Sequence, residues 1–393
     1  KEKIFSSSFI KKFENEKKLI WFHAASIGEV QSIIPIINHL NSKANKFNFL
    51  VTTITFSSGK FLEEEFKFKD NMVHRYLPLD INFLIKRFIS TWQPYAVFFV
   101  DSEIWPNLIL NLKDKGVLIS IINGRITKKS FKRWKIFSNL ANKIFNKFDQ
   151  ILTSNQESID YFRKLGGKNI YHLGNIKFLN KINIDEIKNQ NDNILSSKNF
   201  WCAASTHDDE EKFVIKTHIK IKEKVKNILT IIIPRHIERS EQIKKLCINN
   251  KLKPQIINKD DKILDNNEIV IVNSFGVLPE YLKNAKSVFV GKSLLKRLNK
   301  DGGQNPILPA QMGCKIYHGP YVSNFADIYK FLKDKNISKE IFTVDDLAFN
   351  LIEDFKSNKK NLNQSKELFD RIGETILQKT FKKINYFFDH ESL

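Results

Sequence analysis

Short apolar runs, separated by longer segments of mixed polar and apolar residues, constrain the fold of this chain more than any other feature. In the first half of the chain these runs lie at 18–24, 49–55, 72–78, 95–101, 117–123 and 151–154. In the second half they lie at 200–204, 229–234, 254–258, 268–272, 286–291 and 315–319. Apolar strands that alternate with helical segments are typical of parallel sheets covered by helices on both faces. The pattern therefore predicts an α/β fold with doubly wound sheets.

The length of the chain indicates more than one domain. Its 393 residues exceed the size at which a single hydrophobic core is usual. The segment 179–198 loses the strand rhythm and is rich in Asn, Lys and Asp, which is typical of a linker. We therefore expect one domain at 1–178 and a second at 199–393. The last helices of the chain are candidates for packing back on the first domain.

The two expected domains open with similar stretches. Residues 21–29 read Trp-Phe-His-Ala-Ala-Ser-Ile-Gly-Glu, and residues 200–211 again place Ala-Ala-Ser after an aromatic strand and before acidic residues. In open α/β sheets, ligands bind beyond the carboxyl ends of the strands. If the two domains face one another, both loops border one interdomain cleft. We then expect Glu29 and the turn formed by Ser205, Thr206 and His207 to face the same space.

The charge of the chain points to an acidic partner. It contains 64 Lys and Arg against 43 Asp and Glu, a net charge of +21. Nucleic acid, an anionic membrane surface and a phosphorylated small molecule all fit such a charge. Nucleic acid is disfavoured because no nucleic-acid-binding motif is present and the basic residues are dispersed. The Lys, Asn and Ile content also fits the compositional drift of an AT-rich genome, in which case the charge has no specific partner.

Cysteine usage and hydropathy give an expectation about location. Cys202, Cys247 and Cys314 have no paired spacing, which argues against disulfides and zinc and favours a reduced, cytoplasmic environment. The chain contains no run of about 18 or more apolar residues. It begins at Lys rather than Met, so it can be a fragment whose N-terminal membrane anchor is missing.

Glu29 lies between a predicted strand and the helix expected to follow it. In the first turn of a helix, a carboxylate interacts favourably with the helix dipole, by about 0.3–1 kcal/mol. A carboxylate at the mouth of a cleft can instead remove a proton from a bound hydroxyl. Gly28 beside it allows close approach of the backbone to a ligand. The local sequence leaves both roles open.

A second acidic pair and a basic helix follow in the same half. Asp101 and Glu103 come directly after a buried strand, where carboxylates are costly unless they are paired or used. The alternative is that they are exposed acids at a helix start. Arg125 precedes a basic, aromatic-bearing helix at 128–135, which suits an anionic lipid surface, phosphate groups or a merely solvated basic face.

The second half contains candidate phosphate-binding turns. Ser205 or Thr206 is expected to cap a helix with acids in its first turn. Arg235 and His236 follow a strand, where they suit a phosphate or a carboxylate. Gly302-Gly303 leads to an expected helix start near Pro306, and the exposed N–H groups of such a helix start can cradle phosphate.

Taken in order, these motifs resemble the Kdo (3-deoxy-D-manno-octulosonate) transferase family of lipid A biosynthesis. The matching stretches, at 21–325, are WFHAASIGEV, TTITFSSG, YLPLD, DSEIWPNLI, NGRITKKS, GNIKF, AASTHDDEE, IIIPRHIER, GGQNP and GPYVSNF. The resemblance implies a GT-B architecture of two Rossmann-like domains. It also implies an inverting, metal-independent transfer of Kdo from CMP-Kdo to the 6′-hydroxyl of a lipid A precursor at the cytoplasmic face of the inner membrane.

The resemblance also implies roles for individual residues. Glu29 matches the general base, and Glu103 matches the second acid of a family motif in which Asp101 replaces the first Glu. The implied acceptor-binding residues are Ser26, Gly28, Asp101, Arg125 and Ser130. The implied donor-binding residues are Ser205, Thr206, His207, Arg235, His236, Gly302, Gly303, Gln304 and Asn305. No cofactor or metal is expected beside the donor substrate.

Four positions in the donor half depart from the family pattern, whereas the acceptor half keeps its acids except for the change of Glu to Asp at Asp101. Gln304 replaces His, Leu308 replaces Glu, Val277 replaces Glu and Lys292 replaces Gly. A carboxylate is the natural partner of ribose hydroxyls, so its loss at 308 weakens the expectation for nucleotide binding there. The departures leave two alternatives open, namely a GT-B transferase that uses another sugar nucleotide and a non-catalytic relative that binds anionic lipid.

Overall fold

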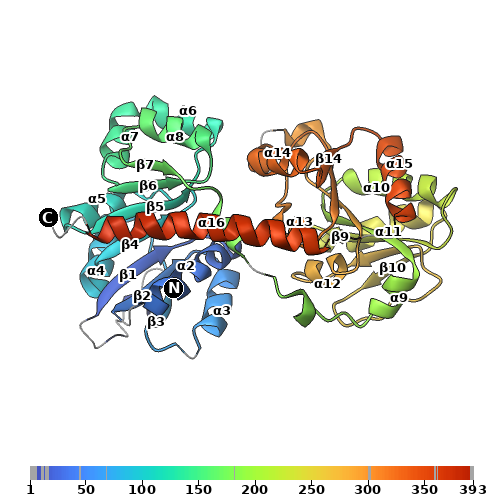
Figure 1. Ribbon diagram of the computed structural model, residues 1–393, viewed down its shortest axis with the longest axis horizontal. Coiled ribbons are helices and arrows are strands. Elements are labelled where there is room, and N and C mark those ends of the chain that lie inside the picture. The colour runs from blue at the N-terminus through green and yellow to red at the C-terminus, as the bar shows by residue number, and fades with distance from the viewer. Residues whose placement is uncertain are drawn as a thin grey trace. The chain divides into compact units, whose positions relative to one another are not determined.

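The structure, a computed structural model, describes residues 7–9, 13, 17–43, 46–67, 69–180, 182–299, 302–357, 360 and 362–389. The chain forms two compact units. Unit 1 comprises Lys1–Lys181 and Asp370–Leu393, and unit 2 comprises Ile182–Phe369. Figure 1 shows a sheet with helices on its faces in each unit. Two doubly wound α/β units confirm the predicted fold class.

Unit 1 is built on a seven-stranded sheet in which every strand pair is parallel, in the order β3-β2-β1-β4-β5-β6-β7. Its strands are β1 (Lys18–His23), β2 (Phe47–Thr53), β3 (Met72–Tyr76), β4 (Ala96–Val100), β5 (Leu118–Gly124), β6 (Gln150–Thr153) and β7 (Ile170–His172). All five residues of β4 are buried, as expected for a strand covered on both faces. The strand order reverses between β1 and β4, which in this architecture is where ligands bind.

The helices of unit 1 cover both faces of the sheet. They are α2 (Ile27–Lys43), α3 (Phe56–Glu65), α4 (Asn82–Trp92), α5 (Pro106–Asp114), α6 (Lys128–Ile136), α7 (Ser138–Phe145), α8 (Gln156–Lys164) and the C-terminal part of α16 (Leu362–Asp389), with short 3-10 helices η1 (Ser7–Phe9) and η2 (Ile176–Leu179). Local signals start several of them. Pro106 occupies the first turn of α5, and the Asp80 carboxylate accepts hydrogen bonds from the N–H groups of Asn107 and Leu108.

Unit 2 has a second seven-stranded sheet, in the order β10-β11-β9-β8-β12-β13-β14, with three strands on each side of β8 where unit 1 has two and four beside β1. Its strands are β8 (Asn199–Thr206), β9 (Ile228–Pro234), β10 (Pro254–Ile257), β11 (Ile269–Val272), β12 (Ser287–Val290), β13 (Lys315–His318) and β14 (Ser338–Glu340). Its helices are α9 (Asp192–Ser197), α10 (Glu210–Lys222), α11 (Ser240–Asn249), α12 (Leu278–Leu282), α13 (Ile307–Gln311), α14 (Ala326–Asp334) and α15 (Val344–Lys356), with η3 (Ile184–Glu186), η4 (Ile237–Arg239), η5 (Lys296–Leu298) and η6 (Ser323–Phe325). The echo of 21–29 at 200–211 therefore falls on β1 and β8, the strands that open the two sheets.

The strands predicted from apolar runs are all present. The described residues also form two strands that the apolar runs do not predict. Both β7 and β14 are edge strands of three residues. The burial of β7 is only partial, so it carries no continuous apolar run. Edge strands have a neighbour on one side only, and their sequences consequently resemble loops.

The segment expected as a linker, 179–198, differs from that expectation over most of its length. From Ile182 onward it belongs to unit 2 and includes α9. Asn191 donates a hydrogen bond to the carbonyl of Asp261, and its side-chain oxygen accepts one from the N–H of Ile263. The polar composition that suggested a linker therefore supplies hydrogen bonds to a loop of unit 2.

The last helix, α16, begins in unit 2 and ends in unit 1 (Figure 1). Its final turns bury Phe381, Ile384 and Phe387 against the sheet of unit 1. His39 of α2 stacks on the ring of Phe381, and Phe98 of β4 packs against Phe387. Residues that follow unit 2 in the sequence thus complete the core of unit 1.

Candidate functional site

The carboxyl edge of the unit 1 sheet brings together the acids of two separate stretches. The loop after β1 carries Ser26, Gly28 and Glu29, and the loop after β4 carries Asp101 and Glu103. These two strands are neighbours in the sheet and lie on either side of the point where the strand order reverses. The position is the one at which open α/β sheets bind ligands.

Glu29 is half-buried in the first turn of α2 and is held by the loop that precedes it. The N–H of Ala25 donates to Oε2 at 2.8 Å, and the hydroxyl of Ser26 donates to Oε1 at 2.8 Å. The N–H of Glu29 in turn lies 3.4 Å from the Ser26 oxygen. This reciprocal arrangement is that of a helix cap, so the capping role predicted from the sequence is present in the structure.

The pKa of the same carboxyl group is higher than that of an ordinary glutamate. Burial and, to a smaller extent, the negative charge of Asp101 raise the pKa of Glu29 to about 7. The hydrogen bonds from Ser26 and Ala25 and the positive charge of Lys177 oppose this rise. A carboxyl group with a pKa near 7 is a better proton acceptor than an ordinary glutamate and still ionises at neutral pH. Glu29 is therefore equipped to take a proton from a bound hydroxyl.

Asp101 is held beside Glu29 by residues that lie far away in the sequence. Its backbone adopts a left-handed conformation with φ of 56°, and Asn123 of β5 donates a hydrogen bond to Oδ1. Lys177 of η2 pairs with Oδ2 at 2.6 Å. Lys177 lies within the stretch GNIKF, and the sequence alone predicts no role for it. A lone lysine in a 3-10 helix gives no local signal of its partner.

Glu103 belongs to a small polar cluster with aromatic walls. The indole of Trp105 donates to Oε2 at 2.9 Å. The Nε2 atom of the fully buried His23 lies 3.3 Å from the same oxygen, and within the described residues it makes no hydrogen bond. His23 is oriented by Thr52, whose hydroxyl lies 2.9 Å from Nδ1. Glu103 is thus fixed at the carboxyl edge, 3.3 Å from the Nε2 atom of His23.

The remaining predicted acceptor residues are placed around this edge or on the helix beyond it. A Cβ at Gly28 would meet open space, so close approach is possible there. Arg125 is half-buried directly after β5, and its N–H donates to the carbonyl of Asp101 at 3.4 Å. Ser130 lies in the first turn of α6, where its N–H donates to the hydroxyl of Thr127. No direct contact of Ser130 with Glu29 is formed.

The basic helix, α6, turns its aromatic rings inward. Phe131 stacks on Tyr161 with a centroid distance of 4.5 Å, and Trp134 packs against Phe145. The exposed apolar side chains are instead Ile136 and Phe137 at the end of the helix. The aromatic residues that suggested a lipid-facing helix therefore attach α6 to the core, while its lysines face solvent.

In unit 2, a buried carboxylate organises the carboxyl edge of the sheet. Glu210, at the start of α10, is fully buried and accepts hydrogen bonds from four backbone N–H groups. The donors are those of His207, Lys292, Ser293 and Leu294, at distances of 2.7–3.0 Å. Glu210 thereby ties the loop after β8 to the loop after β12. The run of acids in the sequence shows that a carboxylate is present here but not which one turns inward.

The predicted donor residues Ser205 and Thr206 are the last two residues of β8. Ser205 has a φ of 55°, and Thr206 is fully buried as the last residue of β8. Neither residue caps α10; Asp209, with a φ of 70°, occupies that position without a side-chain cap bond. The capping expectation was therefore wrong, because β8 runs on through Thr206 and the chain needs Asp208 and Asp209 to turn.

Histidine and arginine side chains gather beside this turn. The His207 ring lies 5.6 Å from that of His236, and burial lowers the pKa of His207, so its imidazole is neutral at pH 7. Arg235 and His236 are exposed after β9, and the N–H of Arg235 donates to the carbonyl of Thr206. Arg239, one turn further, is engaged by Asp208 at 2.6 Å and Glu211 at 3.3 Å.

The Gly-Gly turn is required by close backbone contacts. A Cβ at Gly302 would lie 2.3 Å from the carbonyl of Tyr321, and Gly303 has a φ of 90°. The carbonyl of Gln304 accepts from the hydroxyl of Tyr329 at 3.0 Å. Asn305 accepts from the N–H of Ile307, so it covers one of the donors at the start of α13 that were expected to cradle phosphate.

The departures from the family pattern also have structural settings. Lys292 has a φ of 57°, a left-handed conformation that Gly adopts without strain. Val277 is buried at the start of α12, and Leu308 is half-buried in α13. The three cysteines are buried and unpaired. In the described part of the chain, no cluster of three or more His, Cys, Asp or Glu residues is placed to hold a metal ion, and no helix is long and apolar enough to span a bilayer.

Comparison with known sequences finds one family. The family model described as 3-deoxy-D-manno-octulosonic-acid transferase (kdotransferase) matches residues 3–180. A 3-deoxy-D-manno-octulosonic acid transferase of Rickettsia felis is 30% identical over 338 residues, which are 85% of this chain and 71% of the relative. The transferase of Haemophilus influenzae is 29% identical over 91% of this chain and 83% of the relative.

Comparison with solved structures finds the same architecture at low sequence identity. A protein of Listeria monocytogenes described as a UDP-N-acetylglucosamine 2-epimerase matches with a TM-score of 0.64 and 10% identity. The match covers 95% of this chain and 97% of that protein. At this identity the likeness concerns the fold alone, which is the GT-B type with two Rossmann-like domains predicted from the sequence.

Proposed function

The chain belongs to the 3-deoxy-D-manno-octulosonic acid transferase family, and from this premise we propose that it moves Kdo from CMP-Kdo to the 6′-hydroxyl of a lipid A precursor. As a member of that family it is an enzyme, a glycosyltransferase that transfers Kdo. The donor nucleotide, the acceptor and the mechanism are the parts that we propose.

The proposed reaction is a direct displacement at the anomeric carbon of Kdo. Glu29 accepts the proton of the acceptor hydroxyl, and the oxygen forms the new glycosidic bond. The bond between the anomeric carbon and the phosphate oxygen breaks, and its electron pair leaves with CMP. Because attack and departure occur on opposite faces of the sugar, the configuration at the anomeric carbon is inverted. Glu103 is proposed to assist on the acceptor side.

The observation that supports this mechanism best is the environment of Glu29. Its carboxyl group is fixed by Ala25 and Ser26 at the carboxyl edge of the sheet, and its pKa is raised to about 7. A general base works best when its pKa lies near the working pH. Burial makes the largest contribution to this rise, the negative charge of Asp101 raises the pKa further, and the positive charge of Lys177 lowers it.

The donor is proposed to bind at the carboxyl edge of the unit 2 sheet. Its phosphate carries negative charge, and it gains more as the bond to Kdo breaks. Arg235 is exposed next to the His207–His236 pair, and Ser205 lies near the end of β8, two residues before His207. Positioned cations and hydroxyl donors stabilise developing negative charge in the transition state. The turn Gly302–Asn305 is proposed to complete this site.

Glu29→Gln tests the general base. We expect the rate of Kdo transfer from CMP-Kdo to a tetraacylated lipid A precursor to fall by about 10²–10⁴-fold. CMP-Kdo affinity, measured by calorimetry, should stay unchanged because Glu29 belongs to unit 1. The matched control is Glu157→Gln, which removes another carboxylate from the first turn of a helix, α8, and should leave the rate unaltered. A Glu29→Gln enzyme with the wild-type rate would contradict the assignment.

CMP-Kdo binding tests the donor assignment separately. We expect wild-type protein to bind CMP-Kdo in a saturable manner, and Arg235→Ala to weaken that binding by about tenfold, the effect of one charge-assisted contact. Ser205→Ala should weaken it less. Absence of any binding would favour another sugar nucleotide as donor, for which the replacements at Gln304 and Leu308 provide a structural basis.

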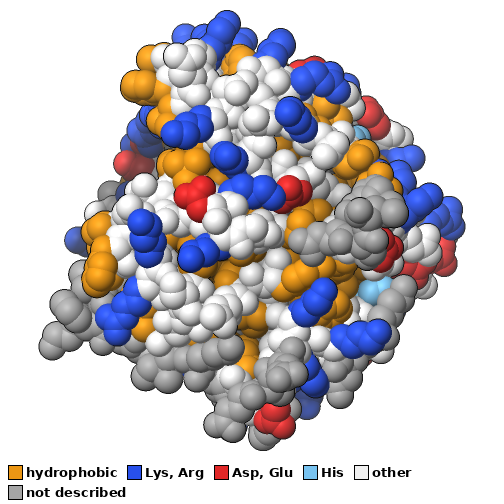
Figure 2. Space-filling model, turned by 90° about the vertical axis from the view of Figure 1, so that its left-hand side faces the viewer, with side chains coloured by type: hydrophobic (Ala, Val, Ile, Leu, Met, Phe, Trp, Pro, Cys, Tyr) orange, Lys and Arg blue, Asp and Glu red, His pale blue; other side chains and the backbone are white. Residues whose placement is uncertain are grey.

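The site of action is proposed to be the cytoplasmic face of the inner membrane, because the acceptor is a membrane lipid. Ile136 and Phe137, at the end of α6, and Leu140 of α7 are exposed beside lysines. Figure 2 shows one face of the molecule, on which Lys and Arg side chains are frequent and hydrophobic side chains lie between them. Such a surface suits peripheral binding to anionic lipids. Phe137→Ser is expected to reduce sedimentation with vesicles that contain phosphatidylglycerol.

A further inference from the structure

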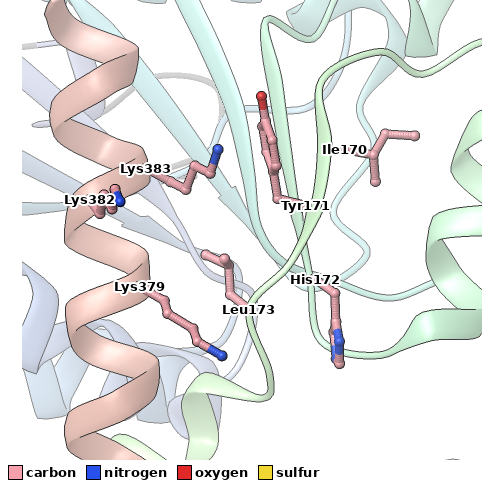
Figure 3. Close-up of a pocket in the computed structure, with 7 residues that line it drawn as sticks. All are labelled: Ile170, Tyr171, His172, Leu173, Lys379, Lys382 and Lys383. Carbon is pink, nitrogen blue, oxygen red and sulfur yellow. The ribbon is translucent and has the colours of Figure 1, made fainter.

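We propose that unit 1 has an anion site of its own, in addition to the donor site proposed for unit 2. It lies in the groove between β7 and the final turns of α16 and binds a phosphate-bearing ligand. The cavity has a volume of about 440 Å³. Its walls are Ile170, Tyr171, His172 and Leu173 on one side and Lys379, Lys382 and Lys383 on the other (Figure 3). None of the residues assigned to donor or acceptor binding lines it, so the site is additional to the transferase machinery.

The charge of this groove is uncompensated. Lys379, Lys382 and Lys383 are spaced i, i+3 and i+4, which places them on one face of α16. Within the described ranges, none of the three ammonium groups is ion-paired with a carboxylate, whereas Lys113 and Lys177 each pair with an aspartate at 2.6 Å. Three like charges on adjacent turns repel one another. An anion bound between them would relieve that repulsion.

One of the three cations is already held in place. The ammonium group of Lys383 lies 3.3 Å from the centre of the Tyr171 ring and 5.6 Å from that of Tyr386. Figure 3 shows the Lys383 side chain extending from α16 toward the ring of Tyr171. This cation–π contact limits the freedom of a long side chain, so less entropy is lost when the lysine binds a ligand. Lys379 and Lys382 remain exposed and available.

The chemistry of the lining favours phosphate over carboxylate. Three ammonium groups within two helical turns match a group with two or more negative charges, and lysine binds phosphate as a point charge. Leu173 and the ring of Tyr171 add an apolar wall. The groove therefore fits a phosphate ester whose remainder is apolar or planar. Such a phosphate can come from a soluble metabolite or from a lipid headgroup.

Inorganic pyrophosphate serves as the probe in a site-specific experiment. Wild-type protein is treated with acetic anhydride with and without pyrophosphate, and acetylation of each lysine is followed by mass spectrometry. We expect acetylation of Lys379, Lys382 and Lys383 to slow at least threefold when pyrophosphate is present. Lys216, Lys224 and Lys226, which are exposed on α10 and the loop after it, act as internal controls and should change less than that. Equal rates with and without pyrophosphate would overturn the proposal.

Calorimetry on matched variants tests the affinity. The triple variant K379Q/K382Q/K383Q should bind pyrophosphate at least tenfold more weakly than wild type at the protected site. The triple variant K216Q/K224Q/K226Q loses the same charge and should bind as wild type does. Both should retain the wild-type melting temperature, since these lysines are outside the core. Equal weakening in both variants would show a nonspecific charge effect and overturn the proposal.

The source of the phosphate is distinguished with vesicles of phosphatidylcholine and phosphatidylglycerol. If K379Q/K382Q/K383Q loses vesicle binding relative to the matched triple variant, and pyrophosphate competes with vesicles for wild-type protein, the ligand is a lipid headgroup. If vesicle binding is equal in the two variants while pyrophosphate protection is lost in the first, the ligand is a soluble phosphate. Loss of neither property would show that the lysines only cover the edge of β7, against the proposal.

Discussion

Glu29 combines a structural and a chemical role in one side chain. Its hydrogen bonds with Ala25 and Ser26 close the first turn of α2, which is a capping arrangement. The same bonds hold the carboxyl group in a partly buried position, where desolvation raises its pKa to about 7. The residue predicted either to cap or to catalyse therefore can do both, because the contacts that fix its position also limit its access to water.

The balance between Asp101 and Lys177 gives a prediction about pH dependence. If ionised Glu29 is the base, the rate rises with pH through the pKa of Glu29. Lys177→Met removes the positive charge that lowers this pKa, so the rising limb of kcat/KM should move to higher pH. Asp101→Asn removes the negative charge that raises it, so the limb should move to lower pH. Each shift should be roughly 0.5–1 pH unit.

The control for that experiment is the Lys113–Asp149 pair, which is also 2.6 Å long and similarly exposed. Lys113→Met breaks this pair but should not move the pH profile, because neither residue contributes to the acidity of Glu29. Shifts of the Lys177 and Asp101 variants in the same direction would contradict the electrostatic explanation. They would indicate that breaking the pair merely distorts the site.

The raised pKa of Glu29 also predicts how the stability of unit 1 depends on pH. An acid whose pKa rises on folding destabilises the fold as it ionises, so stability is lost as pH increases from the unfolded pKa, near 4.5, to about 7. Glu29→Gln lacks this loss. The free energy of unfolding of Glu29→Gln minus that of wild type should therefore increase by ~2–3 kcal/mol between pH 4.5 and pH 7.5.

Urea unfolding followed by tryptophan fluorescence measures this effect. In a Trp201→Phe background the remaining tryptophans all belong to unit 1. Glu157→Gln provides the comparison, since Glu157 lies on the exposed surface of α8. A difference between Glu29→Gln and wild type that stays constant from pH 4.5 to pH 7.5 would show that the Glu29 carboxyl group has an ordinary pKa.

The strand–loop–helix elements that open the two units each carry an acidic residue at the helix start, and the two acids differ in burial and in hydrogen-bond partners. In unit 1, the acid at the start of the helix bonds to its own loop and remains half-buried. In unit 2, the acid at the start of α10 is fully buried and bonds to the loop after β12. Similar sequences thus produce a reactive carboxyl group in one sheet and a structural one in the other. The difference arises because Gly291 allows the β12 loop to approach within reach of Glu210.

Glu210→Gln is predicted to destabilise unit 2 severely. The amide would keep one acceptor oxygen and direct an NH2 group at backbone donors, so buried N–H groups would lose their partner. We expect a loss of about 3 kcal/mol or more in the free energy of unfolding. Fluorescence of Trp201, the tryptophan of unit 2, reports the transition. Glu223→Gln, at the exposed end of α10, should change stability by less than about 0.5 kcal/mol.

The path of the chain links the stability of unit 1 to residues that follow unit 2. Ile384 of α16 is fully buried in unit 1, and Leu351 of α15 is fully buried in unit 2. The bounds expected from the sequence place both residues in the second domain, with the last helices as candidates for packing back on the first. The division of the chain into two compact units assigns them to different cores, because α16 returns to the first sheet (Figure 1).

A pair of core substitutions tests this assignment. Ile384→Ala should destabilise unit 1 by about 2–5 kcal/mol, the usual cost of such a cavity, and leave unit 2 unchanged. Leu351→Ala should have the reverse effect. Hydrogen exchange measured by mass spectrometry reports on the two units separately. Faster exchange of the β8 and β9 peptides in Ile384→Ala would contradict the assignment of this helix to unit 1.

Much of the fold could be read from local patterns. Every strand with a continuous apolar run was predicted, because burial on both faces imposes that run on the sequence. The strand–loop–helix around Glu29 was identified for the same reason. The edge strands β7 and β14 were missed because partial burial imposes no such pattern. The expected linker was misread because polar residues can bond within a domain as well as join two domains.

By itself, the sequence determined the two doubly wound sheets, the family and the acid that opens the first helix. Only the tertiary structure decided which groups act on that acid. Lys177 reaches Asp101 across 76 positions of the chain, and Glu210 reaches the β12 loop across more than 80. Strand periodicity arises from neighbours in sequence, whereas acidity and burial arise from neighbours in space. A carboxylate can therefore be located from the sequence, but its pKa depends on the packed fold.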